Sequence, residues 1–358
     1  MEKISNQGEN TKTGSQMFEI KNGLMYLNAD FDEKPMIWMF DTGVTVATLF
    51  NSEQLNAYEL KKIPFGKTKA ADGTMIETKI LSGDLENGFM SISQKLFAVI
   101  PTMSFNKNDN CEIVDKTDVA GFIGMDVFYD NDSYVEINFE SNHIAVLSQS
   151  DFEELSQQFR PLDAEIKDGH IFLRTKINGK AHKLLLDTGF NGDIIFPYKK
   201  AKKMNLDKSE QYEGLLFRNA ANIDRYGSLI QSADNKLEFG EFNFDVDILF
   251  VESINSSNLG LGFIKNFNWL IDYKNEKVYA QLISNSFSNK LQEKPYKVLA
   301  TEGELRFVKR KTDETEYGLN DVVLSVNSVK ITPENICRFQ KMLNESNNWD
   351  NLQIEIKK

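Results

Sequence analysis

The chain has 358 residues, enough for two or three domains, and its 41% of hydrophobic residues can support full cores. It carries 41 basic and 53 acidic residues, a net charge of −12, with no basic tract. This balance argues against a nucleic-acid-binding surface, which needs clustered Lys and Arg. No apolar run approaches the roughly 18 residues that a membrane helix needs, so we expect no membrane span.

The first 16 residues predict a polar N-terminal tail, because they lack the hydrophobic segment of a signal peptide. Taken literally, this indicates a cytoplasmic chain. The same segment is also typical of an exported or lipid-anchored protein whose signal has been trimmed, so the compartment stays open.

An internal repeat follows. The stretch that begins at Met25 ends in the Asp-Thr-Gly triplet of Asp41, and the stretch that begins at Ile171 ends in that of Asp187. The offsets 171 − 25 and 187 − 41 both equal 146. In each copy an apolar strand runs into the acidic loop (MIWMFDTG and KLLLDTG). We therefore expect two similar halves, residues 17–149 and 150–283.

The copies also agree downstream of the triplets. Each has an apolar segment with glycine, Phe122-Ile123-Gly124 in the first and Gly260-Leu261-Gly262 in the second. Each then continues into a hairpin with a polar tip, residues 135–147 and 270–282. Many short strands separated by turn signals predict a mainly β chain.

The two triplets suggest a pair of catalytic aspartates. One Asp-Thr-Gly alone is an ordinary turn at a strand end, but two copies at the same place in a repeat are unlikely to arise by accident. Two carboxylates that face one another share a proton, so one can activate a water while the other acts as an acid. We predict Asp41 and Asp187 as the catalytic residues, with loop support from Thr42, Gly43, Thr188 and Gly189.

A hairpin that could close over a substrate is predicted at residues 65–80, because Asp72-Gly73 between alternating strands favours a tight turn. The candidate flap residues are Ala71, Asp72, Gly73 and Thr74; the alternative is an ordinary surface hairpin. Residues 211–231 occupy the matching position of the second half but show no such turn.

These motifs resemble the aspartic peptidases of the pepsin and retropepsin clan, over about residues 20–283. The segments FDTGVTVATLF and LDTGFNGDIIFP carry the resemblance, and their local sequence is similar to that of retropepsin-like bacterial proteins. It implies a bilobal acid-protease β-barrel fold with both lobes in one chain, so that a monomer suffices for the active site.

The resemblance further implies an aspartic-type endopeptidase that hydrolyses a peptide or protein substrate without metal or cofactor. Family loops usually follow the triplet with a small residue that can bond to the carboxylate, whereas Val44 and Phe190 stand here. The alternative is a non-catalytic peptide-binding protein with the same fold.

The sequence pattern changes after residue 283. Residues 284–295 predict a linker, and residues 296–358 a small α+β domain with strands at 322–326 and 352–356 and a helix near 333–344, capped by Thr332. Residues 317–331 resemble the core of bacterial PDZ domains, which implies a PDZ-like domain; the alternative is an unrelated α+β tail. Two distant cysteines, Cys111 and Cys337, exclude a disulfide framework, and no Cys/His metal spacing exists.

Overall fold

The computed structural model describes residues 11–52, 55–70, 72–101, 111, 119–129, 132–204, 206, 208–218, 223–283 and 294–358. Most of the expected tail and linker, and Ala71 of the expected flap, lie outside these ranges. The described strands form two sheets, which confirms the mainly β class. None of the helices among these residues is both long and apolar enough to cross a membrane.

The first half of the chain is almost entirely strands, and its first strand already begins within the segment expected to be a tail. Its elements are β1 (Gly14–Lys21), β2 (Leu24–Phe31), β3 (Lys34–Phe40), β4 (Thr48–Asn51), β5 (Lys61–Lys69), β6 (Met75–Glu86), β7 (Ser91–Pro101), β8 (Val119–Ile123), α1 (Asp126–Tyr129), β9 (Tyr134–Asn138) and β10 (His143–Leu147).

The second half is built from a similar series of elements. They are α2 (Gln149–Ser156), β11 (Arg160–Leu162), β12 (Ala164–Lys167), β13 (His170–Ile177), β14 (Lys180–Asp187), β15 (Ile194–Pro197), η2 (Tyr198–Lys203), β16 (Ser209–Arg218), β17 (Asp224–Phe239), β18 (Phe242–Val251), β19 (Asn258–Gly260), α3 (Leu261–Ile264), β20 (Phe267–Asp272) and β21 (Lys277–Leu282).

The sequence repeat is also a repeat of topology. The strand order β2-β3-β8-β4-β7-β6-β5 of the first half recurs in the second as β13-β14-β19-β15-β18-β17-β16. Strands β2 and β13 share one burial pattern, in which alternate side chains face the core. Strands β3 and β14 end in runs of buried apolar residues, because each lies between two other strands of its sheet.

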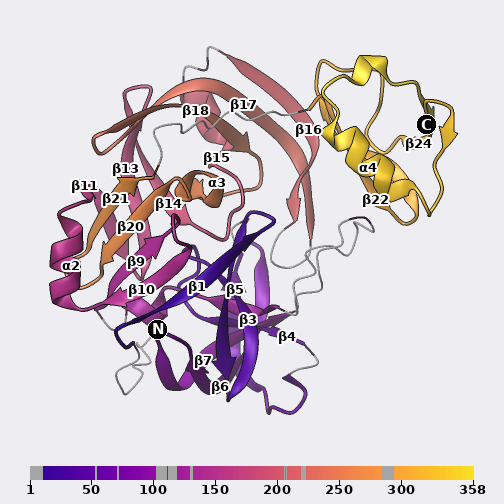
Figure 1. Ribbon diagram of the computed structural model, residues 1–358. Coiled ribbons are helices and arrows are strands. Elements are labelled where there is room, and N and C mark those ends of the chain that lie inside the picture. Colours follow the sequence, from indigo (N-terminus) through magenta and orange to yellow (C-terminus); the bar gives the residue numbers. More distant parts are fainter. Residues whose placement is uncertain are drawn as a thin grey trace.

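The two halves share a sheet and a core. Strand β20 of the second half pairs antiparallel with β9 of the first, with Trp269 opposite Ile137. The resulting path β11-β21-β20-β9-β10-β1 therefore contains strands from both halves (Figure 1). The largest hydrophobic cluster also contains residues of both, from Phe18 to Ala280.

Residues 296–358 form a separate hydrophobic cluster around Tyr296, Phe307 and Phe339. Figure 1 shows this part in yellow, beside β16. Its elements are β22 (Tyr296–Thr301), β23 (Glu304–Lys311), β24 (Val322–Val326), β25 (Val329–Lys330), α4 (Ile336–Glu345), η3 (Trp349–Asn351) and β26 (Ile354–Lys357). Helix α4 begins three residues after Pro333, because Asn335 accepts a hydrogen bond from the Thr332 N–H and holds the preceding residues in a turn.

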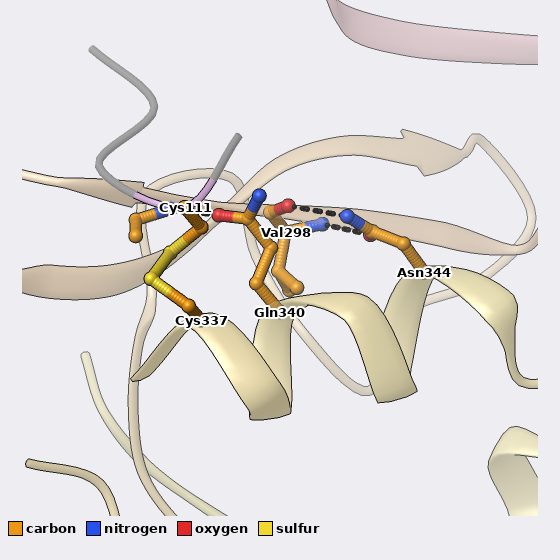
Figure 2. The surroundings of a disulfide bond; sticks show 6 residues. Cys111, Val298, Cys337, Gln340 and Asn344 are labelled. Carbon is orange, nitrogen blue, oxygen red and sulfur yellow. Dashed lines mark hydrogen bonds between the residues drawn. A yellow bond between two sulfur atoms is a disulfide. The ribbon is translucent and has the colours of Figure 1, made fainter. Parts of the chain in front are cut away.

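This C-terminal part is attached to both halves. Strand β23 pairs with β16 and so extends the sheet of the second half, and Arg310 forms a 2.6 Å ion pair with Glu213 across that junction. Cys337 of α4 forms a disulfide with Cys111 of the first half, with Cα atoms 4.6 Å apart (Figure 2). The two distant cysteines thus form one bond, which the sequence did not predict because nothing in it places residues 226 positions apart side by side.

Candidate active site

Four hydrogen bonds join the two acidic loops. The N–H groups of Thr42 and Thr188 each donate to the hydroxyl of the other threonine, both at 3.0 Å. The Thr42 hydroxyl in turn donates to the carbonyl oxygen of Leu186 at 2.7 Å, and that of Thr188 to Phe40 at 2.9 Å. Both threonines are fully buried. The loops are therefore locked together by a symmetric set of bonds at the junction of the halves.

The glycines of the loops bring the two carboxylates together. A Cβ atom on Gly43 would lie 2.6 Å from Oδ1 of Asp187, and one on Gly189 would overlap the carboxylate of Asp41. Each carboxylate therefore rests on the glycine of the opposite loop, in space that a side chain would fill. Asp41 and Asp187 lie within mutual hydrogen-bonding reach as a result.

The two aspartates differ in their surroundings. Burial raises the pKa of Asp41, and the Gly43 N–H, which donates to its Oδ1 at 2.8 Å, partly offsets this rise. Burial and then the negative charge of Asp41 raise the pKa of Asp187 well above its usual range. Both shifts favour a protonated form, so the two carboxylates share a proton as a pair.

Two further polar residues bond to the acidic loops, and no sequence motif includes them. Nδ2 of Asn258 donates to Oδ2 of Asp187 at 2.5 Å. Nε2 of His170 lies 2.9 Å from the carbonyl oxygen of Gly43, so Nε2 carries the hydrogen of that bond. When the His170 ring is charged, it lowers the pKa of Asp41. Only the strand pairing brings these side chains to the site, because neither residue belongs to the repeated pattern.

The pairing also corrects the match between the glycine segments of the two halves. Leu259 lies opposite Leu186 as Ile123 lies opposite Phe40, so Leu259-Gly260 corresponds to Ile123-Gly124. The Gly260-Leu261-Gly262 segment therefore begins two residues too late to match Phe122-Ile123-Gly124. Helices α1 and α3 follow at equivalent places, where the N–H groups of Met125 and Leu261 donate to the carbonyls of Val44 and Phe190.

The hairpin expected to form a flap is present and reaches the second half. Between β5 and β6, the Gly73 N–H donates to the Ala70 carbonyl at 2.8 Å, and Gly73 has φ of +90°. The Asp72 side chain, only 1% exposed, forms a 2.6 Å ion pair with Arg225 of β17. Arg225 also donates to the Thr74 hydroxyl at 2.5 Å. Asp72, Gly73 and Thr74 thus lie at a contact between the halves; Ala71 is outside the described residues.

The position of the second half that matches this hairpin also forms one. Strands β16 and β17 pair antiparallel from Ser209↔Ser232 to Arg218↔Asp224. The sequence showed no tight-turn signal there, and residues 219–222 between the strands lie outside the described ranges. Arg225, which holds the first hairpin, stands near the tip of the second. The two hairpins are therefore in direct contact.

Comparisons with known proteins give this chain no family. No family model matches, and no curated protein matches. Among solved structures, the basic 7S globulin from soybean matches with a TM-score of 0.42 and 9% sequence identity, over 79% of this chain and 98% of that chain. A likeness at this level carries no argument about what this chain does.

The expected membership of the pepsin and retropepsin clan, and of a PDZ-like family for the C-terminal part, is corrected by these findings. No peptidase or PDZ family model matches this chain, and no curated protein of either kind matches it. The motifs behind the resemblance are a few short segments of turn residues and apolar strands, which recur in many unrelated proteins. What the site can do must be argued from its own geometry.

Proposed function

We propose that this chain is an aspartic endopeptidase in its chemistry: it hydrolyses peptide bonds with a water activated between Asp41 and Asp187. The observation that carries the proposal is the meeting of the two carboxylates, each placed on the glycine of the opposite loop. Structural needs alone do not explain two carboxylates held side by side, one buried and one half-buried, because their mutual repulsion costs stability.

In the proposed mechanism the two aspartates take different roles, in keeping with the stronger upward shift of the Asp187 pKa. Asp41, the ionised member, takes a proton from a water that lies between the carboxylates, and the water attacks the carbonyl carbon of the substrate. Asp187, which holds the shared proton, donates it to the carbonyl oxygen. Asp187 is only half-buried, so solvent can reach this side of the pair. In the tetrahedral intermediate Asp41 then gives its proton to the amide nitrogen, the C–N bond breaks and the amine leaves, while Asp187 regains a proton from a hydroxyl of the intermediate as the carboxylic acid forms. No covalent intermediate is needed.

Apolar surroundings support a peptide substrate. Val44, which follows the first loop, packs beside the cluster of Met39, Phe50, Ile76, Ile100 and Phe122. Phe190, at the same place after the second loop, packs beside Ile195, Tyr212, Leu229 and Val251. A chain segment with apolar side chains could therefore find partners on either side of the carboxylates. The hairpin that carries Asp72 would open to admit it.

In this proposal a monomer suffices, because both carboxylates come from one chain. Two equivalent β lobes, residues 17–149 and 150–283, would each contribute one aspartate. Residues 284–295 would link them to the C-terminal part at 296–358. The net charge of −12 favours a peptide or protein partner over nucleic acid.

The second candidate function is a peptide-binding protein that does not cut. Two observations favour it: Val44 and Phe190 have no polar side-chain atom to bond the carboxylates, and the Asp72–Arg225 ion pair fastens the hairpin to the second half. Either could reduce turnover while leaving the binding surface intact.

The deciding experiment is cleavage of a diverse peptide library from about pH 3 to 8. Asp41→Asn and Asp187→Asn should each abolish cleavage, and the double variant should lose little more, because the carboxylates act as a unit. Asp30→Asn, an exposed aspartate on β2, is the matched control and should cut at the wild-type rate. Peptide binding without cleavage at any pH would favour the binding protein. Wild-type rates in Asp41→Asn would refute the mechanism.

A further inference from the structure

Asn258 is a buried polar residue that belongs to neither acidic loop. It is the first residue of β19, lies opposite Leu185 of β14 and is 7% exposed. Its amide Nδ2 donates to Oδ2 of Asp187 at 2.5 Å. The equivalent residue of the first half is Phe122, opposite Met39, whose ring offers no donor to Asp41. The two halves therefore differ at this position beside the carboxylates.

Packing does not explain an asparagine at this place. Within the described residues, the other amide atom, Oδ1, is buried without a hydrogen-bond partner. A buried amide that is half unpaired costs free energy, and an apolar residue such as the Phe122 of the first half avoids that cost. What the amide gains is its bond to Asp187, which neither Val44 nor Phe190 can make.

This bond restricts where the proton of Asp187 can lie. In a protonated carboxyl group the carbonyl oxygen is a stronger acceptor than the hydroxyl oxygen, so the bond from Asn258 favours Oδ2 as the carbonyl oxygen. The proton of Asp187 is then favoured on Oδ1. That oxygen faces the first half: it lies 2.6 Å from the Cβ position of Gly43, and Oδ1 of Asp41 lies 3.1 Å from the same point. The two Oδ1 atoms therefore face a common region.

We propose that Asn258 is a positioning residue, which holds Oδ2 of Asp187 as an acceptor and so keeps the shared proton on Oδ1, toward Asp41. The inference rests on the proposed function for its catalytic meaning, but the position of the proton can be tested without it. It also explains how the pair stays oriented although Val44 and Phe190 give no support.

The expected pH effect has a definite sign. Among the described residues, the titratable groups that act on the pair are the two aspartates themselves and His170 of β13, whose Nε2 lies 2.9 Å from the Gly43 carbonyl oxygen. The Asn258 amide favours the ionised form of Asp187, so its loss raises the pKa of Asp187. Activity requires Asp187 protonated, and its basic limb should therefore move to higher pH, by about one unit. Meanwhile kcat should fall about 10- to 100-fold, because the proton is no longer held in place.

The test uses Asn258→Leu, of similar volume, and Asn258→Met as a second apolar variant in case the first folds poorly. Asn268→Leu is the control: Asn268 is 2% exposed on β20, and its Oδ1 accepts from the Phe139 N–H at 2.9 Å, away from the pair. The control should lose stability without moving the basic limb. A merely structural role for Asn258 would make all three variants behave alike.

Infrared spectroscopy makes the result independent of cleavage. The carbonyl band of protonated Asp187, identified by its loss in Asp187→Asn, should persist to higher pH in Asn258→Leu than in wild type. If wild type cuts no peptide while the carbonyl band still persists to higher pH in Asn258→Leu, the proposed function fails and the role of Asn258 stands. The inference is overturned if Asn258→Leu changes neither the pH at which the band disappears nor the basic limb of activity. A shift to lower pH also overturns it, because the amide then accepts the proton of Asp187.

Discussion

Replacement of Thr188 by valine tests whether hydroxyl bonds hold the two acidic loops together. Valine has nearly the same shape as threonine, so no cavity forms. The change removes the bond from the Thr188 hydroxyl to the Phe40 carbonyl and the bond that this hydroxyl accepts from the Thr42 N–H. Both backbone groups are then left without partners at a junction where Thr42 and Thr188 are 0% exposed.

The magnitude follows from counting those groups. A buried donor or acceptor that loses its partner costs about 1–3 kcal/mol, so the two together should lower the free energy of unfolding by about 2–6 kcal/mol. Thr42→Val should lower the free energy of unfolding by a similar amount, because it leaves the Thr188 N–H and the Leu186 carbonyl without these hydrogen bonds.

The chain supplies a matched control in the same half. Thr175 of β13 is 4% exposed, and within the described residues its hydroxyl is buried without a hydrogen-bond partner. Thr175→Val is the same chemical change at a similar depth, but it removes an unpaired polar group. Its free energy of unfolding should therefore equal or exceed that of wild type.

Urea unfolding followed by tryptophan fluorescence measures all three variants, with a shift of the midpoint at constant slope taken as a change in stability. Cleavage measured alongside should fall in Thr188→Val and Thr42→Val but not in Thr175→Val. Equal losses of stability in Thr188→Val and Thr175→Val would refute the reasoning, since burial alone and not the bonds between the loops would then set the cost.

Two further changes address the attachments between the parts of the chain. Arg225→Met removes the 2.6 Å ion pair of the buried Asp72 carboxylate and should destabilise the protein by about 3–5 kcal/mol, with faster proteolysis of the hairpin; adding Asp72→Asn should recover much of the loss. Cys337→Ser opens a loop of 226 residues and should lower the free energy of unfolding by about 4–5 kcal/mol. Reductant should destabilise wild type but not this variant; equal sensitivity would contradict the disulfide.

The two similar halves could be predicted from the sequence because the same pattern of residues occurs twice in it. The 146-residue offset between Asp41 and Asp187 predicted two similar halves, and the strand orders of the halves agree. Burial requires alternating apolar residues in β2 and again in β13, so both copies keep the pattern that the fold needs. The hairpins at 135–147 and 270–282 were found for the same reason.

Contacts between the two halves, and between them and the C-terminal part, could not be predicted from the sequence. The pairing of β9 with β20, the pairing of β16 with β23 and the Asp72–Arg225 ion pair each join segments that are far apart in the sequence. Such contacts depend on how folded segments pack against one another, and no spacing of residues within a segment predicts them. For this reason we expected the C-terminal part to be joined to the rest only by a linker, although β23 and Cys337 attach it to both halves.

The same reasoning explains why the sequence located the carboxylates but not the residues that distinguish them. Thr42 and Thr188, or Gly43 and Gly189, serve equivalent roles, so duplication reveals them. Asn258 and His170 act on one aspartate each, and their value lies in having no counterpart in the other half. A pair of identical carboxylates has no preferred acid and base, because exchange of the two halves would leave the proton equally placed on either. In the proposed mechanism Asp187 is the acid; the charge of His170, which lowers the pKa of Asp41, favours that assignment, whereas Asn258 lowers the pKa of Asp187 and fixes only its orientation. Both residues break the repeat, so a search for repeated residues passes over them.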